Sequence, residues 1–320
     1  MLNKKRRRIL IFATTISILS SSIGYSLYRE MANDYESYIV SFAEELKNDD
    51  FLVSAHRGFS SLEVENTKKA ISLAAEKQYV DFIEIDARMT QDNKIVLSHN
   101  NSLFILGSER NSRVSDLSFD DALNTEFTYN SFTWPNLFCF NPEGIMQNER
   151  SLKLNSQSYH LASLLDGLKC CGDKKVLLDL KFNGDTVLFC QELKKELRNV
   201  DTSNIIFQSL DIPSLKYLQD TSDFTCQALL KSSRDLIYLD DFERLGFKYD
   251  LLDYELIKEL IEKGKKISVW TIDSTTTLNL VANILGEYYK DVIYITDYPD
   301  LIITKLCEKE QEKVLTKCLG

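Results

Sequence analysis

Short apolar runs alternate with helix-like segments along most of this chain, and that alternation constrains its fold more than any other feature. The strand-like runs lie at 51–55, 80–86, 94–98, 174–180, 204–208, 224–229, 244–248, 266–271 and 291–296. The helical patterns occupy 65–78, 185–198, 211–219, 253–264, 274–285 and 298–307. Strands that alternate with helices form a parallel sheet with crossover helices, and about 250 residues suffice for one such barrel. We therefore predict an α/β fold, a TIM (β/α)8 barrel over residues 51–307.

Residues 101–165 interrupt this alternation. The segment is rich in turn formers and aromatic residues without a sustained period, namely Phe119, Phe127, Tyr129, Phe132, Trp134, Phe138 and Phe140. A long irregular stretch inside a compact domain is usually a functional insertion. We predict an insertion after an early strand that lies over the barrel mouth and forms a wall of the substrate pocket. Residues 308–320 are predicted to be a C-terminal tail.

The N-terminus has the charge pattern of a membrane anchor. Residues 9–28 contain no charged side chain and, as a helix, would span roughly 30 Å, the thickness of a bilayer core. The basic residues within 1–8 predict a cytoplasmic tail, so the body of the chain would lie outside the cell membrane. A cleaved signal peptide is the alternative, because Ser20 to Ser22 are small residues near a plausible cut. Residues 29–50 are polar and amphipathic, which predicts a helical stalk.

Charge and cysteine usage exclude some classes of protein. Six of the 38 basic residues lie in the first 29 positions, so 32 remain against 48 acidic residues. Such a body would repel nucleic-acid backbones and attract divalent cations, so we expect no nucleic-acid partner. The seven cysteines show no CxxC spacing that would predict a zinc or redox site.

Two carboxylates near the end of an apolar run point to a metal ion. Glu84 and Asp86 are two positions apart, so in a strand they share one face, with Ile83 and Ile85 on the other. Neighbouring buried carboxylates repel each other unless a positive charge lies between them, and hard divalent cations prefer oxygen ligands. A salt-bridge network at an exposed strand end is the alternative interpretation.

Two histidines, an arginine and a second acidic pair complete a candidate site. His56 and His99 each follow a strand-like run, which in a barrel is the catalytic face, and they are candidates for proton transfer. Arg57 has the forked geometry that binds phosphate. At another strand end, Asp179 could add a metal oxygen and Lys181 a positive charge for the phosphate. These residue types together favour metal-assisted cleavage of a phosphate ester.

Two further segments have predicted supporting roles. Glu65-Asn66-Thr67 opens a helix, so we expect it to cap that helix and to support the metal site. Trp270 lies at a strand end and could present an aromatic floor to a small polyol, although filling the barrel is the commoner role of tryptophan.

These motifs closely resemble those of the glycerophosphodiester phosphodiesterase family over roughly residues 51–306. The matching segments are HRG (56–58), ENT (65–67), Glu84 with Asp86, Thr90 with Asp92, VLSH ending at His99, DLK (179–181), VWT (269–271) and ITDYPD (295–300). The resemblance implies a TIM barrel that cuts glycerophosphodiesters to glycerol 3-phosphate and an alcohol. It further implies Mg²⁺ or Ca²⁺ on Glu84, Asp86 and Asp179. His56 and His99 would be the acid–base pair, and Arg57 and Lys181 would bind phosphate.

Two positions depart from the family pattern. The family usually has glutamate at the position of Asp179, so the ligand arm here is one methylene shorter. It usually has aspartate after the second histidine, where this chain has Asn100. The first difference bears on the choice and affinity of the metal.

Two alternative functions remain open at this stage. The aromatic insertion beside a membrane anchor also fits a barrel phospholipase that acts on intact lipid, such as a phosphatidylinositol-specific phospholipase C or a sphingomyelinase-D-like enzyme. A barrel that only binds a polyol phosphate is the other alternative. The leading interpretation is a hydrolase of a small glycerophosphodiester or of polymer-linked glycerol phosphate, and the leaving alcohol stays open.

Overall fold

The computed structural model describes residues 30, 32–46, 50–103, 113–129, 141–182 and 184–319, with side chains up to residue 312. The predicted tail over residues 1–8 and the predicted anchor over residues 9–28 lie outside this part. Within the part that is described, no helix has both the length and the apolar character needed to cross a membrane.

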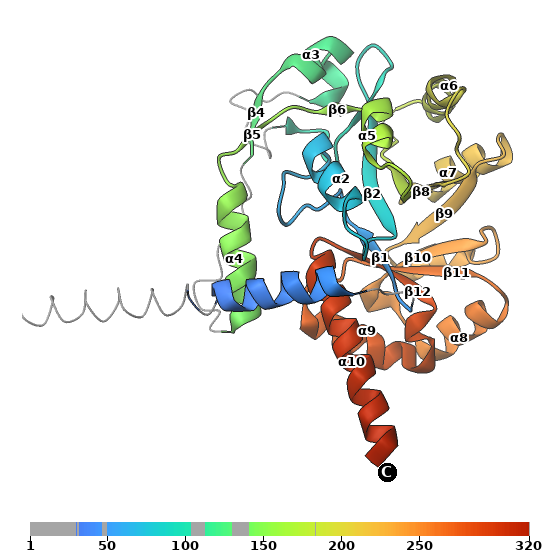
Figure 1. The fold of residues 1–320 in the computed structure, drawn as a ribbon. Helices are drawn as coiled ribbons and strands as arrows, with labels where there is room; N and C mark the ends of the chain where they lie inside the picture. Colours follow the sequence, from blue (N-terminus) through green and yellow to red (C-terminus); the bar gives the residue numbers. More distant parts are fainter. Residues whose placement is uncertain are drawn as a thin grey trace, which may run out of the picture.

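Eight parallel strands close into a barrel (Figure 1). They are β1 (Leu52–Ala55), β2 (Phe82–Met89), β7 (Lys175–Leu180), β8 (Ile205–Ser209), β9 (Thr225–Leu230), β10 (Arg244–Lys248), β11 (Lys266–Trp270) and β12 (Val292–Thr296). Each strand pairs with the next in this series, and β12 pairs with β1, which leaves no open edge. The predicted TIM barrel is confirmed.

Helices form a layer around the barrel (Figure 1). They are α2 (Lys68–Ala75), α5 (Leu164–Cys170), α6 (Thr186–Leu197), α7 (Ile212–Asp220), α8 (Tyr254–Glu262), α9 (Thr275–Leu285) and α10 (Pro299–Leu319), with 3-10 turns at η3 (Ser233–Tyr238), η4 (Tyr249–Leu251) and η5 (Gly286–Lys290). Side-chain oxygens start several of them, as when Thr67 accepts the backbone N–H of Ala70 at α2. The residues expected as a separate tail from 308 onward instead continue α10.

The two faces of each barrel strand have different neighbours, as the alternation in β2 predicted. Ile83 and Ile85 face outward into the main core between barrel and helices. Inside the barrel, a small apolar cluster contains Phe82, Leu177, Ile206, Ile293 and Ile295. The polar side chains of the candidate site lie further along the same inward-facing rows, so this cluster forms the floor beneath them.

The strand predicted at 94–98 is not a barrel strand. Residues Ile95–Leu97 form β3, which pairs antiparallel with the end of β2 and with β6 (Ala162–Ser163). The chain reverses just after Met89, in a turn where Asn93 has a positive φ of 61° and Thr90 donates its hydroxyl to Asp92. The backbone N–H of Ser98 bonds to the carbonyl of Asp86, so the end of β3 returns to the level of the site. His99 reaches the pocket on this returning strand, not on a parallel one as predicted.

The insertion is more regular than the sequence indicated. Its described part contains η2 (Val114–Asp116), α3 (Phe119–Asn124), β4 (Phe127–Thr128), α4 (Pro142–Leu154) and β5 (Ser158–Tyr159). The antiparallel pair of β4 and β5, which α4 separates in the chain, packs with α3 and β3 around a small core that includes Phe127 and Tyr159. Helix α4 was not predicted, although Asn141 caps it and Pro142 occupies its first turn, which are ordinary start signals.

The expected stalk is helical, but it lies against the barrel domain. Residues 32–45 form a helix that crosses α4 and α10 (Figure 1). Ile39 on this helix is fully buried against Met146 and Leu301. Arg150 of α4 is buried between Asp300, with two bonds of 3.1 and 2.5 Å, and Glu36 of this helix at 3.5 Å. The apolar face of the predicted helical stalk thus packs on the surface of the barrel domain.

Candidate active site

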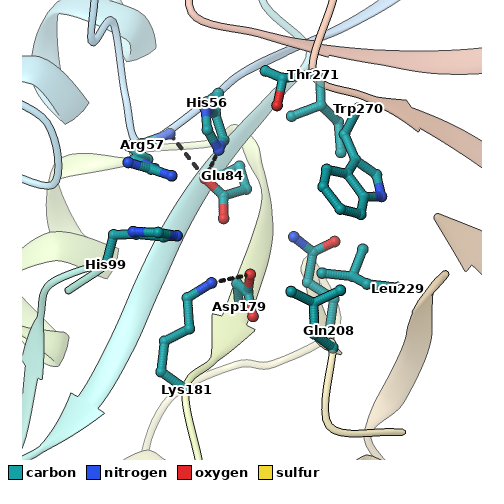
Figure 2. A pocket seen from close by; sticks show the side chains of 12 residues that line it. His56, Arg57, Glu84, His99, Asp179, Lys181, Gln208, Leu229, Trp270 and Thr271 are labelled. Carbon is teal, nitrogen blue, oxygen red and sulfur yellow. Dashed lines mark hydrogen bonds and ion pairs between the residues drawn. The ribbon is translucent and has the colours of Figure 1, made fainter. Parts of the chain in front are cut away.

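A pocket of about 90 Å³ opens at the carboxyl ends of the barrel strands (Figure 2). The charged part of its lining comes from β1, β2, β7 and the end of β3, and includes His56, Arg57, Glu84, His99, Asp179 and Lys181. The other side consists of Gln208, Leu210, Leu229, Trp270, Thr271 and Ile295. The structure therefore brings together residues that are far apart in the sequence.

Three carboxylates meet on the inner face of β2 and β7. Oxygen atoms of Glu84, Asp86 and Asp179 lie within 4.8 Å of one another, and all three side chains are buried. Asp86 and Asp179 are direct partners in the parallel register, which is why they are adjacent. Burial and the neighbouring Asp86 charge raise the pKa of Glu84 to about 8. Such repulsion between buried carboxylates is relieved when a cation binds.

The cluster of three carboxylates fits a hard divalent cation. Asp179 Oδ1 is buried and has no hydrogen-bond partner among the described residues, although an acceptor in this position ordinarily needs one. All three groups offer oxygen, the ligand type that Mg²⁺ and Ca²⁺ prefer. The Nζ atom of Lys181 lies 2.6 Å from Asp179 Oδ2 and 2.9 Å from Asp86 Oδ1. Glu84, Asp86 and Asp179 could together hold a metal ion, with Lys181 alongside.

Lys181 and Arg57 affect Asp86 and Asp179 differently. Burial would raise the pKa of Asp86, but the charges of Lys181 and Arg57 outweigh burial and lower it far below its usual value. For Asp179, burial outweighs Lys181, and the pKa is raised. Asn66 also donates its amide to Asp86 Oδ2 at 2.8 Å and accepts the Asp86 backbone N–H at 2.9 Å. Asp86 is therefore the carboxylate of the three that is held ionised.

His56 bridges two carboxylates. Its Nδ1 donates to Asp297 Oδ1 at 2.6 Å, and its Nε2 lies 3.8 Å from Glu84 Oε2. Burial and the nearby Arg57 disfavour the imidazolium, but Asp297 and Glu84 outweigh them and raise the pKa of His56 to about 9. His56 is thus charged at neutral pH in the metal-free protein.

His99 has the opposite character. Burial and the cations Arg57 and Lys181 lower its pKa to about 4, against the attraction of Asp86. Its Nδ1 contacts the side-chain oxygen of Asn100 at 3.3 Å, and Arg88 donates to its backbone carbonyl. The two imidazoles of one pocket therefore carry different protonation states, as an acid–base pair requires.

Arg57 is fixed by its backbone and by two carboxylates. It has a positive φ of 58°, its backbone N–H donates to Glu84 Oε2 at 2.9 Å, and its Nη1 donates to Glu65 Oε2 at 2.8 Å. Its Nε lies 3.5 Å from Asp86 Oδ2. Gly58 follows with a φ of 80°, and a Cβ there would lie 2.7 Å from the backbone carbon of Ala70. Only glycine fits this approach of the loop to α2.

Comparison with known proteins agrees with this geometry. The model of the glycerophosphoryl diester phosphodiesterase family matches residues 56–301. The chain belongs to the glycerophosphoryl diester phosphodiesterase family. It is 26% identical over 264 residues to the Bacillus subtilis (strain 168) protein YhdW, whose name places it among the glycerophosphodiester phosphodiesterases, and the match covers 78% of this chain and 96% of the relative.

Solved structures share the fold of this phosphodiesterase. A glycerophosphoryl diester phosphodiesterase-like protein of Silicibacter pomeroyi DSS-3 has a TM-score of 0.67 at 17% identity, covering 82% of this chain and 95% of that one. A phosphodiesterase of Oleispira antarctica, in complex with the product sn-glycerol-3-phosphate, has a TM-score of 0.60 at 19% identity, covering 80% and 96%.

The remaining sequence-predicted residues of the phosphodiesterase lie as follows. Trp270 lines the pocket, and its indole N–H donates to the carbonyl of Gly246 at 3.1 Å, which fixes the ring. Glu65 contacts Arg57 and not the carboxylate cluster itself. In the predicted Glu65-Asn66-Thr67 segment, Thr67 caps the helix and Asn66 holds Asp86. His160 lies in the insertion, where its Nδ1 contacts the carbonyl of Thr125.

Two pocket-region residues of the phosphodiesterase were given no role from sequence. Asp297 contacts His56, and its sequence signals were its position at the end of an apolar run and its place in ITDYPD, one of the segments that resemble the family. Gln208 pairs in register with Asp179 on the next strand, and its side-chain oxygen accepts from Gln227 at 2.9 Å. Register along the barrel identifies both residues, and a sequence alone does not give that register.

Proposed function

We propose that this phosphodiesterase hydrolyses glycerophosphodiesters to glycerol 3-phosphate and an alcohol, with a divalent metal ion and with His56 and His99 as acid and base. The observation that carries the proposal is the meeting of both imidazoles, three carboxylates, Arg57 and Lys181 in one pocket. The product in the Oleispira antarctica structure supports the choice of substrate class.

The proposed mechanism follows from the protonation states of the two histidines. His99, which is neutral at pH 7, would take the proton of the attacking group, which is either water or the hydroxyl on the neighbouring glycerol carbon. Attack by water would break the phosphorus–oxygen bond to the alcohol and give glycerol 3-phosphate directly. Attack by the glycerol hydroxyl would break the same bond and leave a cyclic phosphate, which a water molecule would then open to glycerol 3-phosphate. His56, which carries a proton, would give it to the leaving alkoxide. Arg57 and Lys181 would bind the phosphate oxygens and stabilise charge that develops there. A metal ion on Glu84, Asp86 and Asp179 would act as a Lewis acid on the phosphate.

A coupled assay tests the proposed activity. The purified enzyme would be offered glycerophosphocholine, glycerophosphoethanolamine and glycerophosphoglycerol, and the release of glycerol 3-phosphate would be measured with Mg²⁺, with Ca²⁺ and with a chelator. We expect turnover that the chelator abolishes and one of the two ions restores. Turnover in the presence of chelator equal to that with added metal ion would refute the requirement for a metal. Turnover on phosphatidylinositol or sphingomyelin vesicles, with none on the deacylated diesters, would replace the proposal with a phospholipase.

We also propose that residues 9–28 anchor the enzyme in the cell membrane with its barrel outside. The uncharged length and the preceding basic cluster support this arrangement. With the full chain expressed in a bacterial host, we expect the protein to stay in the membrane fraction after alkaline carbonate extraction. External protease should digest the barrel in intact spheroplasts. A shortened, released protein would instead indicate a cleaved signal peptide.

A further inference from the structure

Asp297 lies beside His56 because their two strands are neighbours in the closed barrel. Ala55 and Thr296 are register partners at the ends of β1 and β12, and the backbone N–H of His56 bonds to the carbonyl of Thr296 at 2.9 Å. The next residue on each strand therefore projects at the same level of the barrel mouth. Asp297 Oδ1 accepts from His56 Nδ1 at 2.6 Å, a length typical of a hydrogen bond between charged groups.

One further hydrogen bond holds the Asp297 carboxylate, and another holds the Asp297 backbone. Ser60, in the loop after β1, donates its hydroxyl to Asp297 Oδ1 at 2.8 Å. Asp273, just beyond the end of β11, accepts the backbone N–H of Asp297 at 2.8 Å. The carboxylate is thus held by His56 and Ser60, and the backbone that carries it is held by Asp273, before any substrate binds.

The contact also determines which nitrogen of His56 faces the reaction. A carboxylate accepts hydrogen bonds but does not donate them, so Nδ1 of His56 carries a proton. Nε2 then points away from Asp297 toward Glu84, at 3.8 Å, on the side of the pocket. In Figure 2 the His56 ring lies above Glu84, and His99 lies below it and to the left.

We propose that Asp297 is a positioning residue that acts through His56, fixing the imidazole with Nδ1 protonated so that Nε2 is the nitrogen that exchanges protons with the substrate. The inference rests on the proposed function, in which His56 transfers a proton. Asp297 is not predicted to touch substrate. A carboxylate in this relation orients the ring and stabilises the imidazolium.

A double-mutant cycle separates this role from a merely structural one. The enzyme with Mg²⁺ would be assayed on glycerophosphocholine as the wild type, Asp297→Asn, His56→Ala and the double variant. We expect Asp297→Asn to lower kcat by about 10²-fold with KM changed less than about threefold. In the His56→Ala background the same substitution should change kcat less than about threefold, because the group through which Asp297 acts is gone. Multiplicative losses in the double variant, or full kcat in Asp297→Asn, would overturn the proposal.

A second measurement does not depend on turnover. The chain has three histidines, so ¹⁵N-histidine NMR can assign each ring from the His56→Ala, His99→Ala and His160→Ala variants. We expect a slowly exchanging Nδ1 proton on His56 in the wild type that is lost in Asp297→Asn. If the wild-type enzyme shows the slowly exchanging His56 proton but hydrolyses no diester, the proposed function is rejected and the hydrogen bond between His56 and Asp297 still stands. A rapidly exchanging Nδ1 in the wild type would reject the inference.

Asp250→Asn is the matched control. Asp250 also follows a barrel strand, but it is an exposed partner of Lys248 and lies outside the pocket. It should leave kcat and the His56 proton unchanged. Ser60→Ala, which removes only one support of the carboxylate, should give an intermediate loss of kcat that also disappears in the His56→Ala background. If Ser60→Ala lowered kcat by the same factor in the wild-type and His56→Ala backgrounds, Ser60 would not act through Asp297 and His56.

Discussion

Asn100 gives His99 a neutral hydrogen-bond acceptor, with His99 Nδ1 3.3 Å from the amide oxygen. His56, across the pocket, has a carboxylate in the equivalent place, at Asp297 Oδ1. The family usually carries aspartate after its second histidine, so this chain lacks a charge that would favour protonated His99. The neutral amide of Asn100 adds no negative charge beside the His99 ring, whereas a carboxylate there would favour the imidazolium.

Asn100→Asp should therefore raise the pKa of His99 above its present value of about 4, because a carboxylate beside the ring favours the imidazolium. NMR titration of the three histidines measures this shift, and the exposed His160 serves as an internal reference. Asn279→Asp, which places a charge on an exposed position of α9, is the control and should shift none of them. If Asn100→Asp leaves the pKa of His99 unchanged, the side chain of residue 100 does not contact the His99 ring in solution.

His56→Ala and His99→Ala should each lower turnover by about 10²–10⁴-fold, the usual contribution of a positioned general acid or base. Mg²⁺ binding, followed by calorimetry, should change little, because neither imidazole belongs to the carboxylate cluster. His160→Ala should be nearly neutral, since His160 is exposed on the insertion, where its Nδ1 contacts the carbonyl of Thr125. If His160→Ala were inactive and His99→Ala active, the assignment of His99 to the acid–base pair would be wrong.

Glu84→Ala and Asp86→Ala should each remove most Mg²⁺ binding and activity, with partial rescue by excess ion, because each removes a charged oxygen ligand from a buried cluster. Asp179→Ala should have the same effect. Asp179→Glu introduces the longer glutamate side chain that the family usually has at this position, and it should keep or improve the affinity for Mg²⁺. The exposed Asp173→Ala is the control. If a Glu84→Ala, Asp86→Ala double variant bound Mg²⁺ with wild-type affinity, the proposed metal site would be wrong.

The local patterns were sufficient to predict the barrel and to select the chemical groups of the site. Alternating apolar residues in β2 place Glu84 and Asp86 inward whatever the neighbours are, and strand ends in a parallel barrel share one face. The same argument led to a wrong placement of β3, because a three-residue apolar run has no direction of its own. The turn after Met89, with Asn93 in a left-handed conformation, decides that β3 runs antiparallel.

Long-range pairing accounts for what the sequence did not predict. Asp297 and His56 are 241 positions apart, and only closure of β12 onto β1 brings them together. Helix α4 depends similarly on tertiary contacts, since its buried Arg150 is compensated by Asp300 from the other end of the domain. An arginine in an irregular polar segment predicts solvent exposure until its partner is known.

Arg150→Met should lower the free energy of unfolding by about 3–5 kcal/mol, because it leaves the Asp300 carboxylate buried without its partner. Urea denaturation followed by far-UV circular dichroism measures the change. Arg150→Met combined with Asp300→Leu should recover much of the loss, since the buried carboxylate is gone and the partly exposed Glu36 keeps Lys153 at 3.7 Å. Lys263→Met, which breaks the exposed pair with Glu259, should leave the free energy of unfolding nearly unchanged. A loss in Arg150→Met no larger than that of the control would show that Asp300 is solvated.

The metal-free enzyme should lose stability as the pH rises from about 6.5 to about 9. The folded-state pKa of His56 is raised to about 9 from an ordinary value of 6.5, and that of Glu84 to about 8 from 4.5. Both groups therefore bind more protons in the folded than in the unfolded state across this range, so folding becomes less favourable as protons are withdrawn. The lowered pKa of His99, about 4 against an ordinary 6.5, opposes this trend only at the lower end of the range, where the unfolded imidazole still binds protons. The lowered pKa of Asp86 acts only in acid.

Thermal unfolding in chelator at several pH values tests this prediction. The wild-type Tm should fall between pH 6.5 and 9, and His56→Ala or Glu84→Gln should flatten the slope, whereas His160→Ala should keep it. Saturating Mg²⁺ should reduce the alkaline loss, because a bound cation stabilises the ionised carboxylates that repel one another in its absence. A Tm that rises over this range in chelator would show that the site carboxylates and His56 do not retain extra protons in the folded state.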